Sequence, residues 1–222
     1  MYINSVDGTS IFYETIGGGP AIILIHGLGG DHKIWYETGW IDELKNQFKV
    51  ISMDLRGCGQ SGIPQDKDSY SIENHIADIS AIIVQENITN PMLFGWSLGG
   101  TITTQFVARN TIRKAVICGT YFGLIFSKEF IDKGIEGTDD IVLQNRMRAF
   151  SEWPIIQPVQ MKCPYLVYTG AKDGNVVKQL NNQREEILKN NGKLVVFDEL
   201  DHIGLLNRKE IVKETVLKFI NE

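Results

Sequence analysis

Basic residues, cysteine pairs and long apolar runs are all scarce in this chain of 222 residues. Acidic residues outnumber basic ones by 27 to 22, and the net charge of −5 disfavours a nucleic-acid-binding surface, which needs a basic patch. No apolar run approaches the roughly 18 residues of a membrane span. The first ten residues, MYINSVDGTS, lack the basic and apolar regions of a signal peptide. We therefore expect neither a nucleic-acid nor a membrane partner.

The three cysteines, Cys58, Cys118 and Cys163, are widely spaced and form no C-x-x-C pair. That number and spacing fit neither a disulfide framework nor a zinc site. Unpaired cysteines are typical of proteins in reducing compartments. We therefore predict a cytoplasmic location and no bound metal.

Short apolar runs, by contrast, recur along the whole chain. They are mostly unbroken by polar residues, which is typical of strands buried on both faces of a parallel sheet. The runs are AIILIHG (21–27), FKVISMD (48–54), PMLFG (91–95), KAVICG (114–119), PYLVYTG (164–170) and KLVVFDE (193–199). Near the start, Asp7-Gly8 separates two β-rich stretches and predicts an antiparallel hairpin.

Amphipathic stretches lie between these runs. Isoleucines at 72, 76, 79 and 83 follow helical spacing, and Ser71 precedes them as an N-cap. Strand and helix signals alternate, and no linker or repeat divides the chain. The pattern predicts a single domain, residues 1–222, of the α/β class, with a mostly parallel central sheet and helices on both faces.

One interval, about 121–160, interrupts the alternation of strand and helix signals, because about forty residues separate two predicted strands. We predict an insertion that folds as a small cap of one or two helices over the edge where the strands end. Small-molecule pockets usually have apolar walls. Phe122, Phe126 and Trp153 of this cap, together with Trp96, are therefore our candidate substrate-binding residues. The alternative is that the aromatic residues only pack the cap onto the core.

The stretch GCGQSG (57–62) has the spacing G-x-G-x-x-G of a dinucleotide-binding turn. Such a turn must open directly into a helix whose N-terminus binds the pyrophosphate. Here the next residues are IPQDKDSY, which indicate a loop. The glycines are thus predicted to make a tight turn after a strand, with no nucleotide.

The sequence GWSLG (95–99) matches G-x-S-x-G, with an apolar strand before it and a helix-compatible stretch after it. That context is typical of a nucleophile elbow. A serine on so sharp a turn has a strained backbone, and side chains at 95 and 99 would collide with neighbouring chains. Ser97 is therefore the candidate nucleophile, with its hydroxyl exposed at a helix N-terminus.

A serine hydroxyl needs a base to become a nucleophile. In this fold the partners follow in the order serine, acid, histidine, and His202 is the only histidine after Ser97. We predict His202 as the base. We expect His26 to hydrogen-bond within its own turn, and we interpret His32 and His75 as surface residues.

The acid is expected on the loop after the penultimate strand, where TGAKDG supplies Asp173. Asp198 and Asp201 lie too close to His202 in the chain to reach its Nδ1 without strain. Two backbone N–H groups complete the predicted site as an oxyanion hole. They are those of Leu98, which follows the serine, and Leu28, in the glycine-rich turn after an early strand.

With these residues in place, the chain resembles the α/β-hydrolase superfamily over nearly its whole length. HGLGGD, DLRGCGQS, GWSLGG, TGAKD and the late DH match successive landmarks of that family in order. The resemblance implies that Asp54, Arg56 and Ser61 brace turns beneath the site. The chain departs from the family in having no proline shortly after the acid and in having a short cap.

The resemblance and the residues together predict a serine hydrolase that cleaves carboxylic esters of small or short-chain acyl groups, without a cofactor. Serine at the elbow argues against the haloalkane dehalogenases and epoxide hydrolases, which use a carboxylate nucleophile. Enol-lactonase and C–C bond hydrolase activities remain open on the same three residues. A non-catalytic ligand-binding protein of this fold is the alternative from another class.

Overall fold

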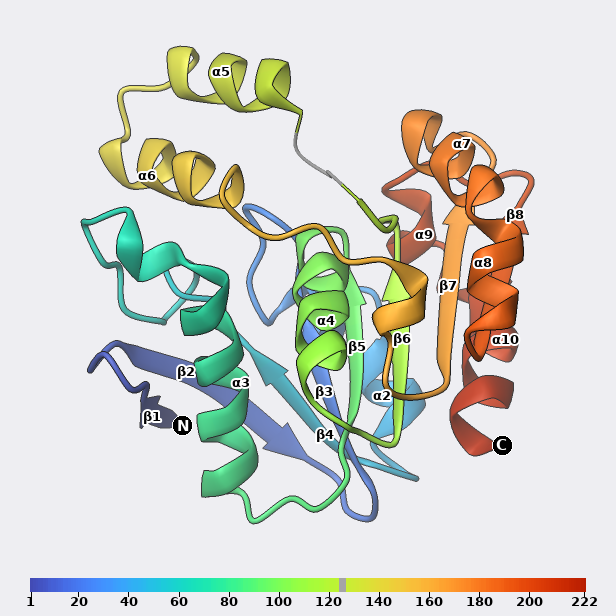
Figure 1. The fold of residues 1–222 in the computed structure, drawn as a ribbon. Coiled ribbons are helices and arrows are strands. Elements are labelled where there is room, and N and C mark those ends of the chain that lie inside the picture. Colours follow the sequence, from blue (N-terminus) through green and yellow to red (C-terminus); the bar gives the residue numbers. More distant parts are fainter. Residues whose placement is uncertain (124–126) are drawn as a thin grey trace.

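The computed structural model describes residues 1–123 and 127–222, and these form one eight-stranded sheet flanked by helices (Figure 1). The strand order is β1-β2-β4-β3-β5-β6-β7-β8. The strands are β1 (Tyr2–Asn4), β2 (Ser10–Ile16), β3 (Ala21–Ile25), β4 (Lys49–Met53), β5 (Met92–Trp96), β6 (Lys114–Cys118), β7 (Tyr165–Gly170) and β8 (Gly192–Phe197). All six predicted apolar runs therefore form strands.

The six strands from β3 to β8 run parallel, whereas β1 and β2 pair antiparallel, β2 also with β4. The hairpin predicted at Asp7-Gly8 joins β1 to β2. Gly8 has the left-handed φ of 83° that the turn requires. The mostly parallel sheet predicted from the sequence is confirmed.

Helices cover both faces of the sheet, as predicted. Along β3, Ile23 and Ile25 pack into the core on one side, and Ile22 and Leu24 pack into the core on the other. The first side is covered by α3 (Ile72–Gln85), α4 (Leu98–Arg109), α7 (Gly174–Asn182) and α8 (Arg184–Lys189). The second is covered by α1 (Ile34–Glu37), α2 (Trp40–Leu44), α9 (Gly204–Asn207) and α10 (Lys209–Asn221). Within the described ranges, no helix is long and apolar enough to cross a membrane.

The interval between β6 and β7 holds α5 (Lys128–Glu136), α6 (Ile141–Phe150) and the short 3-10 helix η2 (Pro158–Gln160). In Figure 1, α5 and α6 lie beyond the end of the sheet at which the parallel strands finish. The loop after β4 holds α6 in place, because Asn145 donates to the carbonyl of Gln65 and Arg146 donates to Cys58 Sγ. We call residues 121–160 the cap segment.

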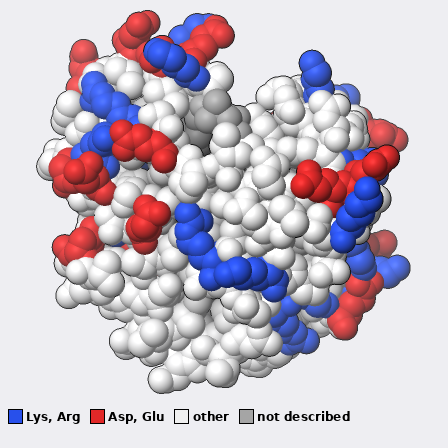
Figure 2. Space-filling model, in the orientation of Figure 1, with Lys and Arg blue, Asp and Glu red and all other residues white. Residues whose placement is uncertain are grey.

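Charges of both signs are intermixed over the cap segment and over the α7–α8 side of the molecule (Figure 2). On α5, Lys128 pairs with Asp132 and Lys133 pairs with Glu129 at i,i+4 spacing. Such pairs stabilise a solvated helix by only a few tenths of a kcal/mol each. Their contribution is to keep α5 helical rather than to attach it to the core.

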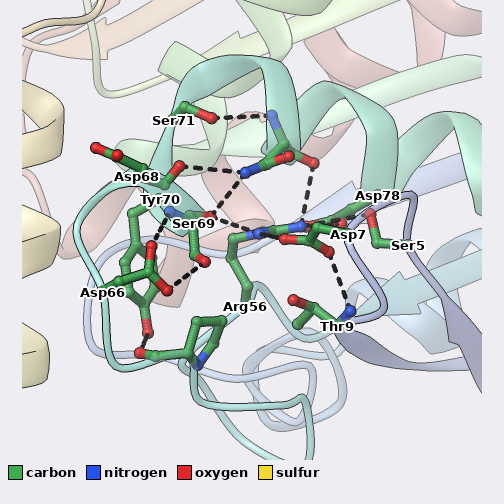
Figure 3. A network of polar contacts seen from close by, with 12 residues as sticks. Ser5, Asp7, Thr9, Arg56, Asp66, Asp68, Ser69, Tyr70, Ser71 and Asp78 are labelled. Atoms are coloured by element: carbon green, nitrogen blue, oxygen red, sulfur yellow. Dashed lines mark hydrogen bonds and ion pairs between the residues drawn. The ribbon is translucent and has the colours of Figure 1, made fainter.

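A buried ion network fixes the loop that follows β4 (Figure 3). Arg56 is fully buried and donates two hydrogen bonds to Asp78 of α3, Nε to Oδ2 at 2.8 Å and Nη2 to Oδ1 at 2.6 Å. Its Nη1 donates to Asp7 Oδ2 at 2.7 Å and to the carbonyl of Ser69, just before α3. One guanidinium thus ties the β1–β2 turn, the start of α3 and the β4 loop together.

The glycines of GCGQSG serve this same loop. A Cβ at Gly59 would lie 2.2 Å from Asp54 Oδ2, so only glycine fits there. Ser61 accepts a hydrogen bond from Phe12 N and donates one to the carbonyl of Asp54. The next α-helix begins only at Ile72. These contacts agree with the prediction of a tight structural turn.

Asp7 should make the stability of the fold sensitive to acid. Burial alone would raise its pKa, but hydrogen bonds from Arg56 and Thr9 outweigh burial and lower it from 3.8 to about 2. Its contribution is therefore complete above pH 3.8 and is lost as the pH falls towards 2. Screening of this partly exposed carboxylate limits the contribution to the order of 1 kcal/mol.

Urea unfolding of the wild type and of Asp7→Asn at several pH values checks this expectation. The stability difference between the two proteins should be present at pH 6 and should shrink below pH 4. A difference that stays constant down to pH 2.5 would contradict the depressed pKa.

Candidate active site

Ser97 occupies a sharp turn between β5 and α4. Its backbone has φ 56° and ψ −117°, a region that non-glycine residues rarely adopt, and its N–H donates to the carbonyl of Cys118 at 2.8 Å. Flanking glycines make the turn possible. A Cβ at Gly95 would lie 2.1 Å from the Gly99 carbonyl oxygen, and one at Gly99 would lie 2.0 Å from that of Ile25. The strand–turn–helix context predicted for GWSLG is present.

The structure brings Ser97, His202 and Asp173 together from three separate loops. His202 Nε2 lies 3.0 Å from Ser97 Oγ, and His202 Nδ1 lies 3.0 Å and 3.1 Å from the two oxygens of Asp173. His202 follows β8, and Asp173 follows β7 directly before α7. These are the three residues predicted from chain order, and they form one continuous hydrogen-bonded chain.

The acid fixes the tautomer of the histidine. A carboxylate can only accept a hydrogen bond, so Nδ1 of His202 carries the proton and the lone pair of Nε2 faces the Ser97 hydroxyl. Asp173 is nearly buried, and Thr169 Oγ1 donates to its Oδ2 at 3.1 Å. Asp201, the rejected alternative, is exposed and accepts from the N–H of Gly204 instead.

The two predicted oxyanion donors lie on turns that flank the serine. Leu98 begins α4, and Leu28 lies in the turn after β3, where a Cβ at Gly27 would lie 3.2 Å from Ser97 Cβ. Within the described residues, neither N–H donates to another protein group. His26 holds the Leu28 turn from behind, since its Nδ1 contacts the Gly27 carbonyl at 2.7 Å and its Nε2 accepts from Leu55 N.

Burial lowers the pKa of His26 to about 4, so this histidine is neutral at physiological pH. With Leu55 N–H donating to Nε2, the proton of the ring resides on Nδ1 and points at Gly27. The contact with Gly27 is the expected hydrogen bond within the turn, whereas the bond from Leu55, 29 residues away in the chain, was not predicted.

A family model of the alpha/beta hydrolase fold matches residues 20–140, which is more than half of the chain. The chain belongs to the alpha/beta hydrolase fold family. The match covers the turns that carry Leu28 and Ser97 and the Arg56–Asp78 ion pair, but not Asp7.

Two curated relatives of this α/β hydrolase align over about half of it. It is 35% identical over 109 residues to the AB hydrolase superfamily protein YisY of Bacillus subtilis, covering 49% of this chain and 40% of that protein. It is 30% identical over 96 residues to the pimeloyl-[acyl-carrier protein] methyl ester esterase of Vibrio campbellii, covering 43% of this chain and 34% of that esterase. In these matches the chain spans less than half of each relative's length.

Solved structures align over the full length. An esterase from Exiguobacterium antarcticum has a TM-score of 0.87 at 21% identity, covering 100% of this chain and 99% of that one. The enol-lactonase from Burkholderia xenovorans has a TM-score of 0.82 at 21% identity, covering 100% of both chains. At these identities the likeness establishes the shared fold alone.

The aromatic residues predicted for the substrate pocket of this α/β hydrolase lie in different surroundings. Phe122 is buried and packs against Tyr165. Trp153 is buried against Phe150, and its Nε1 donates to the carbonyl of Tyr70 at 3.2 Å. These contacts favour the alternative stated above, that the aromatic residues pack the cap segment onto the core. Phe126 lies outside the described residues.

Trp96, the fourth candidate, is buried beside the histidine. Its ring centroid lies 5.4 Å from that of His202.

Two histidines interpreted as surface residues are buried, so that interpretation was wrong. His32 is enclosed because its N–H and its Nδ1 both bond Asp54, at 2.6 Å and 2.8 Å. His75 lies on the inner face of α3 against Trp153, and burial lowers its pKa well below the usual value. Among the described residues, neither ring hydrogen-bonds Ser97.

One group among the described residues has the composition of a metal site, namely Asp31, His32 and Asp54, with ligand atoms within 4.8 Å of one another. Both carboxylate oxygens of Asp54 already accept hydrogen bonds inside the protein, however. Its Oδ1 accepts from His32 N and its Oδ2 accepts from Gln60 N. The cluster therefore works as an internal brace of the β4 loop.

Proposed function

We propose that this α/β hydrolase is a serine hydrolase that cleaves carboxylic esters of small or short-chain acyl groups through an acyl-enzyme. One observation carries the proposal. Ser97 Oγ, the His202 imidazole and the Asp173 carboxylate form a chain of contacts of 3.0 to 3.1 Å on a strained elbow. This is the arrangement that activates a serine for attack on a carbonyl carbon.

The proposed reaction has two halves. His202 Nε2 takes the proton of Ser97 as Oγ attacks the ester carbonyl, and Asp173 stabilises the imidazolium that results. The N–H groups of Leu28 and Leu98 bind the oxyanion of the tetrahedral intermediate. His202 then gives its proton to the leaving alcohol. Water, activated by the same histidine, hydrolyses the acyl-enzyme and regenerates Ser97.

These steps use only side chains and backbone groups of the protein, so the proposal involves no metal or organic cofactor. The buried, unpaired state of all three cysteines supports a reducing cytoplasmic environment as part of the same proposal.

The comparisons support this class of chemistry without fixing the substrate. Similar proteins include a methyl ester esterase, a second esterase and an enol-lactonase. Ring-opening of an enol-lactone and C–C bond hydrolysis use the same acyl-enzyme chemistry and remain the second candidates. Epoxide hydrolases also share the fold, but serine at position 97 replaces the carboxylate nucleophile that such enzymes use.

A series of p-nitrophenyl esters from acetate to palmitate, assayed below micelle-forming concentrations, tests the substrate class. Because the cap segment is short, we expect it to enclose little volume and kcat/KM to peak between roughly C2 and C8. Each methylene that meets an apolar wall should gain up to about 0.8 kcal/mol, and those beyond the pocket should gain nothing. An optimum at C12 or longer would indicate a lipase-like groove instead.

The same assay, extended to lactones and diketones, separates the alternatives. Faster turnover of a lactone than of every ester would favour the enol-lactonase alternative. Binding of esters without any turnover would favour a non-catalytic member of the fold.

A further inference from the structure

The imidazole of His202 lies in a slot formed by Trp96 and Gly119. The indole ring of Trp96 lies 5.4 Å from the imidazole, centroid to centroid, with the two planes at 37°. Gly119, at the end of β6, has a left-handed φ of 65°, and a Cβ there would lie 3.1 Å from Cε1 of His202. A larger residue at 119 would therefore press on the imidazole, which would have to move by a few tenths of an ångström.

Trp96 also holds the backbone of the histidine. Its Nε1 donates to the main-chain carbonyl of His202 at 3.3 Å. In the part of the chain that the structure describes, this is the only hydrogen bond that the main chain of His202 makes. The residue lies in the loop between β8 and α9, and its side chain is 35% exposed. The indole thus anchors the main chain of His202 itself, within a partly exposed loop.

The same indole contacts the oxyanion turn. A Cβ at Gly27 would lie 2.7 Å from two carbon atoms of the indole ring, so ring and glycine backbone are in close contact. Trp96 itself is the last residue of β5 and directly precedes Ser97. The rigid side chain of Trp96 therefore contacts both the loop that carries His202 and the turn that carries Leu28. Trp96 itself directly precedes the proposed nucleophile in the chain.

We propose that Trp96 is a positioning residue that holds the His202 imidazole at hydrogen-bonding distance from Ser97 Oγ, rather than a residue that lines the substrate pocket. This inference rests on the proposed function, because it assigns Trp96 a part in the same hydrolysis. Its physical basis is that misplacing a catalytic group by about 1 Å can cost on the order of a hundredfold in rate. Loss of the indole should therefore slow the chemical step and leave substrate binding unchanged.

Two substitutions separate the contributions of the indole. Trp96→Phe keeps an aromatic ring against His202 and Gly27 but removes the N–H donor. Trp96→Leu removes both. Trp35→Phe is the matched control, because Trp35 is a fully buried indole of the same core whose Nε1 has no hydrogen-bond partner within the described residues. Thermal unfolding of each variant shows which of them remain folded.

The readouts are kcat and KM for p-nitrophenyl acetate, and the rate of inactivation by a small organophosphate. For Trp96→Phe we expect kcat to fall about tenfold, the usual size of one lost hydrogen bond. For Trp96→Leu we expect about a hundredfold. KM should stay within about twofold in both, and the inactivation rate should fall in parallel with kcat, because a small organophosphate depends on the activated serine and little on the pocket. Trp35→Phe should leave all three values unchanged.

A rise in KM at constant kcat in either variant would overturn the inference and restore Trp96 as a substrate-binding residue. Unchanged kcat in Trp96→Phe would overturn it even if Trp96→Leu failed to fold. Failure of the proposed function is separately visible, as activity retained by Ser97→Ala. In that case the inference falls as well.

Discussion

Replacing Ser97 with alanine is expected to lower kcat for p-nitrophenyl acetate by about 10³-fold or more while the fold stays intact. Only Oγ is lost, and with it the atom that the acyl group would be bonded to. The elbow itself depends on Gly95, Gly99 and the bond from Ser97 N to Cys118, none of which needs the hydroxyl. Initial rates of the pure variant, with circular dichroism to verify folding, give the answer.

His202→Ala should be as inactive as Ser97→Ala, because residues of a catalytic triad act as a unit. Ser80→Ala provides a matched control, since Ser80 lies on α3 and, within the described residues, its hydroxyl bonds only the carbonyl of Ile76. That variant should keep full activity. If Ser97→Ala kept more than about a tenth of wild-type activity, Ser97 could not be the nucleophile.

Replacing Arg56 with methionine is expected to destabilise the protein by about 3–5 kcal/mol. The substitution leaves the fully buried carboxylate of Asp78 without a counter-charge and releases the turn that Asp7 anchors. Removing one partner of a buried ion pair costs more than removing both, because the remaining charge stays desolvated. Urea unfolding at pH 7 measures the loss.

The double variant Arg56→Met/Asp78→Leu supplies the internal check. It should recover part of the stability lost in the single variant, since no uncompensated charge remains in the core. Arg208→Met is the surface control, because the Arg208–Glu210 pair is solvent-exposed and exposed pairs contribute little. A loss below about 1 kcal/mol in Arg56→Met would show that the network of Figure 3 is not a main support of the fold.

The sequence predicted the sheet and the elbow at Ser97 because their signals are local, whereas His202 and Asp173 were predicted from chain order. A doubly buried strand is a continuous apolar run, and an elbow is a strand, a glycine-flanked serine and a helix. The burial of His75 had a local signal that was overlooked. His75 lies three residues after Ile72 and four before Ile79, so the periodicity that predicts α3 also places it on the buried face.

Other features depend on contacts between distant segments. His32 is buried because Asp54, 22 residues later in the chain, bonds it twice. The residues near His32 in the sequence do not indicate that Asp54 is its partner. The helices α1 and α2 have only four and five residues, which is too short for a helical period to appear. The surroundings of the cap aromatic residues likewise depend on contacts between distant segments. Whether Trp153 faces a ligand or Tyr70 depends on how the cap segment packs against the rest of the domain.

Among the described strands, β8 pairs only with β7, at one edge of the sheet, and the loop that follows it carries His202. On a ribosome, which releases the N-terminal part of a chain first, the segment with Ser97 emerges about a hundred residues before the segment with His202. A nascent chain would therefore hold its proposed nucleophile without a base until this last strand has docked. Esterase activity could be followed during refolding, or after a fragment that ends before β8 is mixed with the missing C-terminal piece. The rate at which activity appears would then report when β8 pairs with β7, rather than when the hydrophobic core forms.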